Sequence, residues 1–157
     1  LGTSPEQGSF ALTVFFSIGI FMTYIGGLLG DKYGPIKIIR LSLLIWLPSM
    51  FLLTQVPEFS VTIMMPLAYL ILLMIGAAKA ISYSPVIVLG QTYLAKSIGF
   101  ASGITLGVSQ TIGGVIAPVV GNLADTYSLP VAMMTLVPFL VMGLGASLIL
   151  KDPKKLQ

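Results

Sequence analysis

Apolar residues form five long runs along the chain, and short polar segments separate these runs. The runs cover about residues 9–29, 36–55, 61–83, 98–122 and 130–150. Each run reaches the length of about 20 residues that an α-helix needs to cross the hydrocarbon core of a bilayer. The pattern predicts an all-α integral membrane protein with five transmembrane helices, embedded in the lipid bilayer.

The third run is less regular than the others. Its apolar character continues to about Gly90, but residues 82–85 interrupt it with the sequence Ser-Tyr-Ser-Pro. Because proline disrupts the hydrogen-bonding pattern of a helix, we expect a bend or break there and end the predicted span near residue 83. Trp46 lies in the middle of the second span, so we expect it to pack against another helix.

Composition supports the membrane assignment. Of the 157 residues, 56% are hydrophobic and only 8% are charged, whereas soluble domains carry roughly a quarter charged residues. The net charge of +3 comes from lysines in short loops, so nucleic acid is not an expected partner. The chain contains no Cys and no His, which excludes disulfides, thiolate nucleophiles and His-ligated metals and removes the usual general base. We expect no cofactor, no metal and no enzymatic activity.

Basic residues predict the orientation in the membrane. Three segments that five alternating spans place on one side carry seven of the eight Lys and Arg residues: Lys32, Lys37, Arg40, Lys96, Lys151, Lys154 and Lys155. The opposite segments, residues 1–8, 56–60 and 123–129, carry none. Because cytoplasmic loops are enriched in Lys and Arg, we expect a cytoplasmic C-terminus and an outside residue 1. That orientation implies at least one earlier span in a longer parent protein.

A short pattern, Gly-x-Leu-small-Asp-x-Tyr, occurs twice. It starts at Gly27 and again at Gly121, and each copy follows a span that contains glycine. Three spans separate the copies, so they lie on opposite sides of the membrane. This arrangement is typical of inverted three-helix repeats in secondary transporters. The last three spans form one predicted unit, and the first two belong to another.

The first copy resembles the signature loop of the major facilitator superfamily, in which an acidic residue, basic residues and glycines connect two helices. The matching positions are Gly27, Gly30, Asp31, Lys32, Gly34 and Lys37, whereas Pro35 and Ile36 replace basic residues. The resemblance implies that the five spans are the last five helices of a twelve-helix transporter, whose N-terminal half is missing here. It also implies a gating role for this loop, with Asp31 as a latch on the cytoplasmic side. Alternatively, Asp31 is a solvated helix cap.

Residues 90–103, together with Gly113, Gly114 and Pro118, resemble the fosmidomycin-resistance type of efflux protein. This branch implies proton-driven export of a small molecule from the bacterial cytoplasm, and hence a location in the cytoplasmic membrane. The chain departs from that branch at Ala95, which replaces a common proline, and at residues 126–128, which lack a closing glycine.

The fourth run is rich in small residues at helical spacing. We expect tight helix packing, which would also suit a gliding interface, at Gly99, Gly103, Gly107, Gly113, Gly114, Pro118 and Gly121. Polar residues within the spans are candidates for a substrate cavity: Lys79, Tyr83, Gln110, Tyr69 and Tyr24. Each of these polar groups either faces a water-filled path or bonds another helix.

Lys79 is the charge inside an apolar run. It lies 18 residues after Val61, or about 27 Å along a helix, near the far edge of a bilayer core about 30 Å thick. It therefore either extends to the cytoplasmic interface or lies in a cavity, where it binds an anionic substrate group or takes part in coupling. Tyr83, four residues later, shares its helix face.

The leading hypothesis is proton-coupled efflux of a drug-like or anionic compound. The alternatives are an uptake carrier for a sugar or organic anion, and a membrane subunit that does not transport. Between the two hinges, no predicted span contains a carboxylate, since Glu58 lies in the polar turn at residues 56–60. A proton-coupling acid is therefore expected in the missing half.

Overall fold

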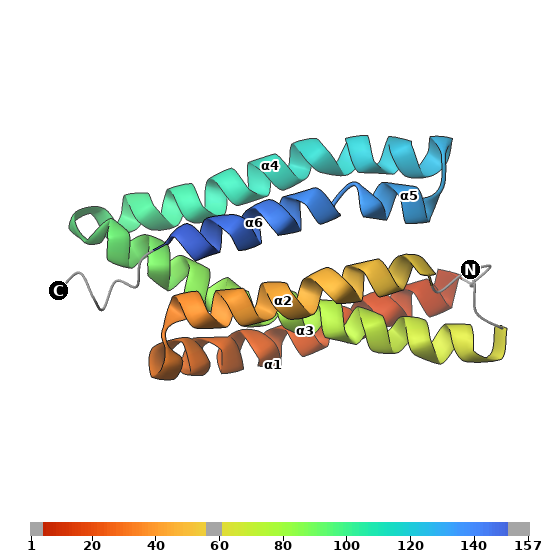
Figure 1. Cartoon of the computed structure of the whole chain (residues 1–157), viewed down its shortest axis with the longest axis horizontal. Coiled ribbons are helices and arrows are strands. Elements are labelled where there is room, and N and C mark those ends of the chain that lie inside the picture. Colours follow the sequence, from red (N-terminus) through yellow and green to blue (C-terminus); the bar gives the residue numbers. More distant parts are fainter. Residues whose placement is uncertain (1–4, 56–60, 151–157) are drawn as a thin grey trace.

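The structure is a computed structural model that describes residues 5–55 and 61–150, and this part of the chain is helical with no strand. Figure 1 shows the helices as long, roughly aligned rods. Their bounds are α1 Pro5–Tyr33, α2 Pro35–Gln55, α3 Val61–Tyr93, the 3-10 helix η2 Ala95–Ser97, α4 Ile98–Thr126, α5 Leu129–Met134 and α6 Val137–Ile149. Five helical segments within the described ranges are long and apolar enough to cross a membrane. The prediction of an all-α protein with five membrane spans is confirmed.

The helices form two neighbouring groups. α3 packs along both α1 and α2, and α6 packs along α2, so that α1, α2 and α3 lie together beneath the pair formed by α4 and α5–α6 in Figure 1. A buried apolar cluster of Met50, Ala68, Ile71 and Ile75 joins α2 to α3, and residues of α5 and α6 pack against it. α2 and α3 therefore form the centre of the described fold.

Glycine makes the sharp turn between α1 and α2 possible. Gly34 has a φ of 97°, a backbone conformation that side chains rarely adopt, and its N–H donates to the carbonyl oxygen of Gly30 at 2.9 Å. Pro35 then begins α2, where its missing N–H is not needed. The backbone conformation of this turn therefore explains why the signature loop has a glycine at position 34.

Glycines also bring α1 and α3 close together. An added Cβ at Gly26 would lie 2.7 Å from the Cα atom of Ile81, and one at Gly30 would lie 3.1 Å from the ring of the buried Pro85. Such small residues allow helix backbones to approach in a membrane.

Two predicted spans differ from the observed helices. α3 does not end near residue 83 but continues through Pro85 to Tyr93, because the hydroxyl of Ser82 bonds back to the carbonyl of Lys79 at 2.9 Å and the proline ring packs against α1. The fifth span, predicted as one helix, is interrupted between α5 and α6 ahead of Pro138.

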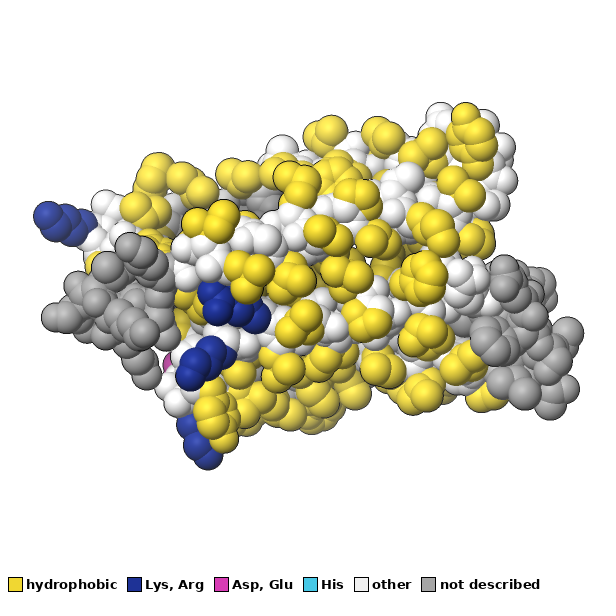
Figure 2. All heavy atoms as spheres, viewed as in Figure 1, with side chains coloured by type: hydrophobic (Ala, Val, Ile, Leu, Met, Phe, Trp, Pro, Cys, Tyr) yellow, Lys and Arg dark blue, Asp and Glu magenta, His cyan; other side chains and the backbone are white. Residues whose placement is uncertain are grey.

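Basic side chains gather at one end of the molecule. Figure 2 shows the described Lys and Arg side chains of this face at the left, the end where Figure 1 places the α1–α2 turn and the α3–α4 connection. The turn between α4 and α5, which carries the second copy of the repeat, lies at the opposite end. The two copies therefore face opposite ways, as predicted. Lys151, Lys154 and Lys155, and the loop at 56–60, lie outside the described residues.

Candidate functional site: a cleft between α3 and α4

A cleft of about 530 Å³ opens where α4 diverges from α3. The two helices are joined near their connection, where the side-chain amide of Gln91 donates to the hydroxyl of Ser102 at 2.9 Å. Beyond that point they separate, and Trp46 of α2 contributes to the wall between them. A cavity of this size lies in the range of about 300–1,000 Å³ that is typical of small-molecule sites.

Three of the predicted cavity residues line this one cleft. Lys79 and Tyr83 come from α3 and Gln110 comes from α4. Lys79 and Tyr83 share a helix face because they are four residues apart, whereas Gln110 joins them only through the packing of α4 beside α3. All three side chains are exposed within the described chain, so all three are accessible from the cleft.

The observed length of α3 changes the depth assigned to Lys79. α3 runs from Val61 to Tyr93, so Lys79 lies 18 residues from its start and 14 from its end. At about 1.5 Å per residue these distances are about 27 Å and 21 Å. The side chain of lysine reaches only about 6 Å. Lys79 thus lies near the middle of α3, 14 residues before its end, and not near the end of the span as predicted.

The described polar side chains that line the cleft carry one positive charge and no negative charge. Lys79 is the charged residue among those that line it, and neither Asp nor Glu is among the described lining residues. The hydroxyls of Ser82 and Ser109 donate to the carbonyls of Lys79 and Thr105 on their own helices, which leaves the lysine ammonium, the Gln110 amide and the Tyr83 hydroxyl to meet a ligand. The cleft therefore offers positive charge and donors without a carboxylate to balance them.

A second hollow of about 340 Å³ lies between α1 and α3. Phe15, Gly19 and Thr23 line its α1 side, and Lys79 and Tyr83 line it from α3. The Nζ atom of Lys79 is 5.9 Å from the centre of the Phe15 ring, within the distance of about 6 Å at which a cation is attracted to an aromatic face. Lys79 and Tyr83 thus border both hollows.

The other two predicted cavity residues are not among those that line the cleft. Tyr69 makes an edge-to-face contact with Phe10 of α1, with ring centres 6.3 Å apart. Tyr24 is 70% exposed on α1. In the signature loop, Asp31, Lys32 and Lys37 are exposed.

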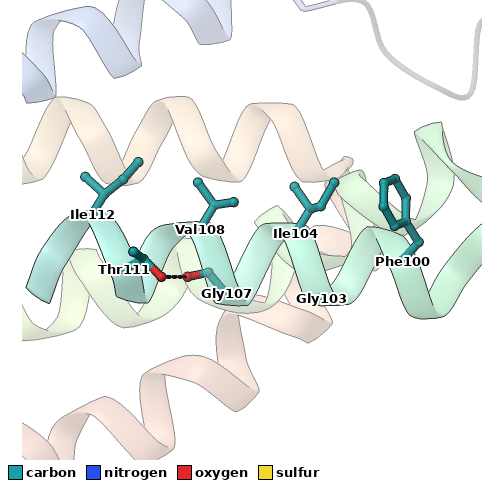
Figure 3. Close-up of a pocket in the computed structure, with 7 residues that line it drawn as sticks. All are labelled: Phe100, Gly103, Ile104, Gly107, Val108, Thr111 and Ile112. Atoms are coloured by element: carbon teal, nitrogen blue, oxygen red, sulfur yellow. Dashed lines mark hydrogen bonds between the residues drawn. The ribbon is translucent and has the colours of Figure 1, made fainter.

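The glycine-rich face of α4 has no partner within the described chain. An added Cβ at Gly99, Gly103, Gly107, Gly113, Gly114 or Gly121 would meet no atom within 4 Å, and Pro118 is exposed. Figure 3 shows part of this face, a shallow groove formed by α4 alone, where Gly103 and Gly107 lie beside Ile104 and Val108. The predicted close packing at these glycines is therefore not made by the helices described here.

One polar contact and one unsatisfied donor have no signal in the sequence. Arg40, expected only as a cytoplasmic charge, donates from Nε and Nη2 to the carbonyl oxygen of Ser147, at 3.0 and 2.6 Å. These atoms belong to residues 107 positions apart. Trp46 packs against the apolar cluster as expected, but its buried Nε1–H has no acceptor among the described residues.

The described residues include no group of three or more His, Cys, Asp or Glu side chains that could hold a metal ion.

Comparison with known proteins agrees with the fold. The profile of the Major Facilitator Superfamily matches residues 1–157. The chain is 32% identical over 151 residues to YfnC of Bacillus subtilis (strain 168), described as an uncharacterized MFS-type transporter. This alignment covers 96% of the chain but 35% of YfnC, so the chain spans about a third of that relative's length. No solved structure matches the chain. With five membrane-spanning helices, a signature loop and a profile match along its whole length, the chain belongs to the Major Facilitator Superfamily.

Proposed function

We propose that this chain is part of the C-terminal half of a secondary active transporter that exports a drug-like or anionic small molecule in exchange for protons. Membership of a transporter family and similarity to an MFS-type transporter support membrane transport and argue against an enzyme. The resemblance of residues 90–103 to the fosmidomycin-resistance branch supports efflux from the bacterial cytoplasm.

The observation that carries this proposal is the mid-span lysine in an open cleft. A charged residue at the centre of a bilayer costs about 2.5–3.5 kcal/mol on insertion scales, and such residues face a water-filled cavity when they are retained. Lys79 borders the cleft together with Tyr83 and Gln110. A water-filled path for a small molecule explains why a charged residue is present in this span, whereas a purely structural span would not need one.

The remainder of the transporter supplies what these helices lack. The unoccupied glycine face of α4 suits close contact with a helix of the missing N-terminal half. A proton-coupling carboxylate would belong to that half, since none is among the described residues that line the cleft. The end that carries Lys32, Lys37, Arg40 and Lys96 would face the cytoplasm, together with the C-terminus.

Proton-driven flux tests this function. The full-length protein is reconstituted in liposomes, and substrate movement is followed under an imposed proton gradient of either direction. Export coupled to inward proton flow is the expected result. Proton-driven uptake would favour the alternative, a carrier for a sugar or organic anion, and no gradient-dependent flux would favour a subunit that does not transport.

Substitutions in the cleft link that flux to this site. Ser109→Phe places a ring in the cleft, whereas Val115→Phe adds the same ring at an exposed α4 position that is not among the lining residues. We expect Ser109→Phe to reduce transport at least about tenfold at equal expression, and Val115→Phe to leave it near the wild-type rate. Lys79→Ala should also reduce transport. Equal rates in Ser109→Phe and Val115→Phe would rule out the cleft as the transport path.

A further inference from the structure

Lys79 can be reached from two separate hollows. It borders the cleft between α3 and α4 and also the hollow between α1 and α3. In the structure its Nζ atom lies 5.9 Å from the centre of the ring of Phe15, which lines the hollow between α1 and α3. The flexible stem of lysine carries a mobile point charge, so one side chain can present that charge to either hollow.

Neither hollow balances this charge. The described residues that line the two hollows include no Asp and no Glu, and the Phe15 ring offers only the weak attraction of an aromatic face. A cation within a membrane span is best satisfied by a group of opposite charge that also accepts its hydrogen bonds. In the cleft, the Gln110 amide and the Tyr83 hydroxyl provide further donors, so a carboxylate or similar anion would complete the site.

We infer that Lys79 is the anion anchor of the transporter and that it has two positions: over the Phe15 ring when the cleft is empty, and in the cleft when an organic anion is bound. The substrate class is an amphipathic organic anion, because the cleft also presents apolar surface from Val86, Ile87 and Leu106. This inference rests on the proposed transport function and selects the anionic class within it.

Three probes of one shape separate charge recognition from apolar binding. Naphthoate, naphthamide and naphthamidinium share a ring system and carry negative, zero and positive charge. Their equilibrium binding is measured with the purified full-length protein. We expect naphthoate to bind about tenfold more tightly than the other two, the size of effect that a charge-assisted hydrogen bond gives. Failure to bind naphthoate, or equal affinity for all three probes, would overturn the inference.

Variants of the anchor and of its resting place test the two positions. Lys79→Gln should lower the affinity for naphthoate at least about tenfold and bring it level with that for naphthamide, while Lys79→Arg keeps the preference for the anion. Phe15→Leu removes the competing ring and should raise the affinity for naphthoate about two- to fivefold. Phe21→Leu, at an exposed α1 position that lines neither hollow, should leave the affinity for naphthoate unchanged. A preference for naphthoate that survives in Lys79→Gln, or no difference between Phe15→Leu and Phe21→Leu, contradicts the assignment.

Flux measurements on the same preparations keep the two proposals apart. Proton-driven flux without a preference for anions would remove the role of Lys79 as anchor and leave the transport function standing. Anion binding that depends on Lys79, without gradient-driven flux, would support the anchor and remove the proposed function.

Discussion

Gly26→Ala probes the closest approach between two helices in the fold. The Cβ atom that this change adds would lie 2.7 Å from the Cα atom and 2.8 Å from the carbonyl carbon of Ile81, and still closer to the carbonyl oxygen. Carbon atoms in contact prefer a separation of about 3.5–4.0 Å. All three obstructing atoms belong to the backbone of α3, so no side chain can rotate away, and α1 must move by about 1 Å.

The magnitude follows from two opposing effects. Overpacking a well-packed contact costs about 1–3 kcal/mol, and an obstruction by backbone atoms favours the upper part of that range. Alanine has a higher helix propensity than glycine by about 1 kcal/mol, which offsets part of this loss. Gly19→Ala, on the same helix, has no atom within 4 Å of the added Cβ and therefore gains propensity without a clash. Because both variants gain this propensity, we expect Gly26→Ala to be less stable than Gly19→Ala by the cost of the clash, about 2–3 kcal/mol.

Reversible unfolding in mixed detergent micelles measures this difference. The free energy of unfolding is determined for the wild type, Gly26→Ala and Gly19→Ala under identical conditions. If Gly26→Ala were as stable as the wild type or more stable, as expected for Gly19→Ala, this result would refute the close approach of α1 and α3 at Ile81. A loss in Gly19→Ala as large as that in Gly26→Ala would show that a general glycine requirement of α1, and not this contact, determines the result.

The same assay checks two further changes. Arg40→Gln should lower the free energy of unfolding by about 1–2 kcal/mol, because Arg40 donates to the carbonyl oxygens at the end of α6. Arg40→Lys, which lacks the guanidinium fork, should recover only part of this stability. Wild-type stability in both variants would contradict the contact. Trp46→Phe removes a buried donor that has no acceptor among the described residues and should leave stability unchanged or raise it by up to about 1 kcal/mol. Trp46→Ala should lose about 3 kcal/mol, and an equal loss in both Trp46 variants would show that Nε1–H has a partner.

Run length and charge were sufficient to predict the five spans and their alternation. A membrane helix needs about 20 apolar residues, and the loops on the cytoplasmic side are enriched in basic residues, so both features are local in the sequence. The extent of α3 is not local in this way. Its polar interruption at residues 82–85 stays helical because Ser82 is satisfied by its own helix and Pro85 packs against Gly30 of another. The prediction ended this span about ten residues too early. It therefore placed Lys79 near the end of the helix, whereas the observed helix has Lys79 near its middle.

The residues of the candidate site could likewise be predicted only in part from the sequence. Spacing alone places Lys79 and Tyr83 on one face of a helix, and the cleft contains both. Gln110 comes from a different helix, and Tyr69 and Tyr24, which looked equally suitable, do not line the cleft. Which polar residue of a span faces a cavity depends on the rotation of that helix against its neighbours, and hydrophobic periodicity is weak where every face is apolar.

Glycine illustrates why the rest depends on tertiary structure. Gly26 and Gly30 of α1 face another helix of this chain at contact distance, whereas Gly103 and Gly107 of α4, at the same spacing, face none. Helix flexibility alone would not require glycines to recur on one face of α4, because their effect on the backbone does not depend on direction. A one-sided row of small residues is what close helix contact requires, so we expect the α4 face to contact a helix that does not belong to the described residues.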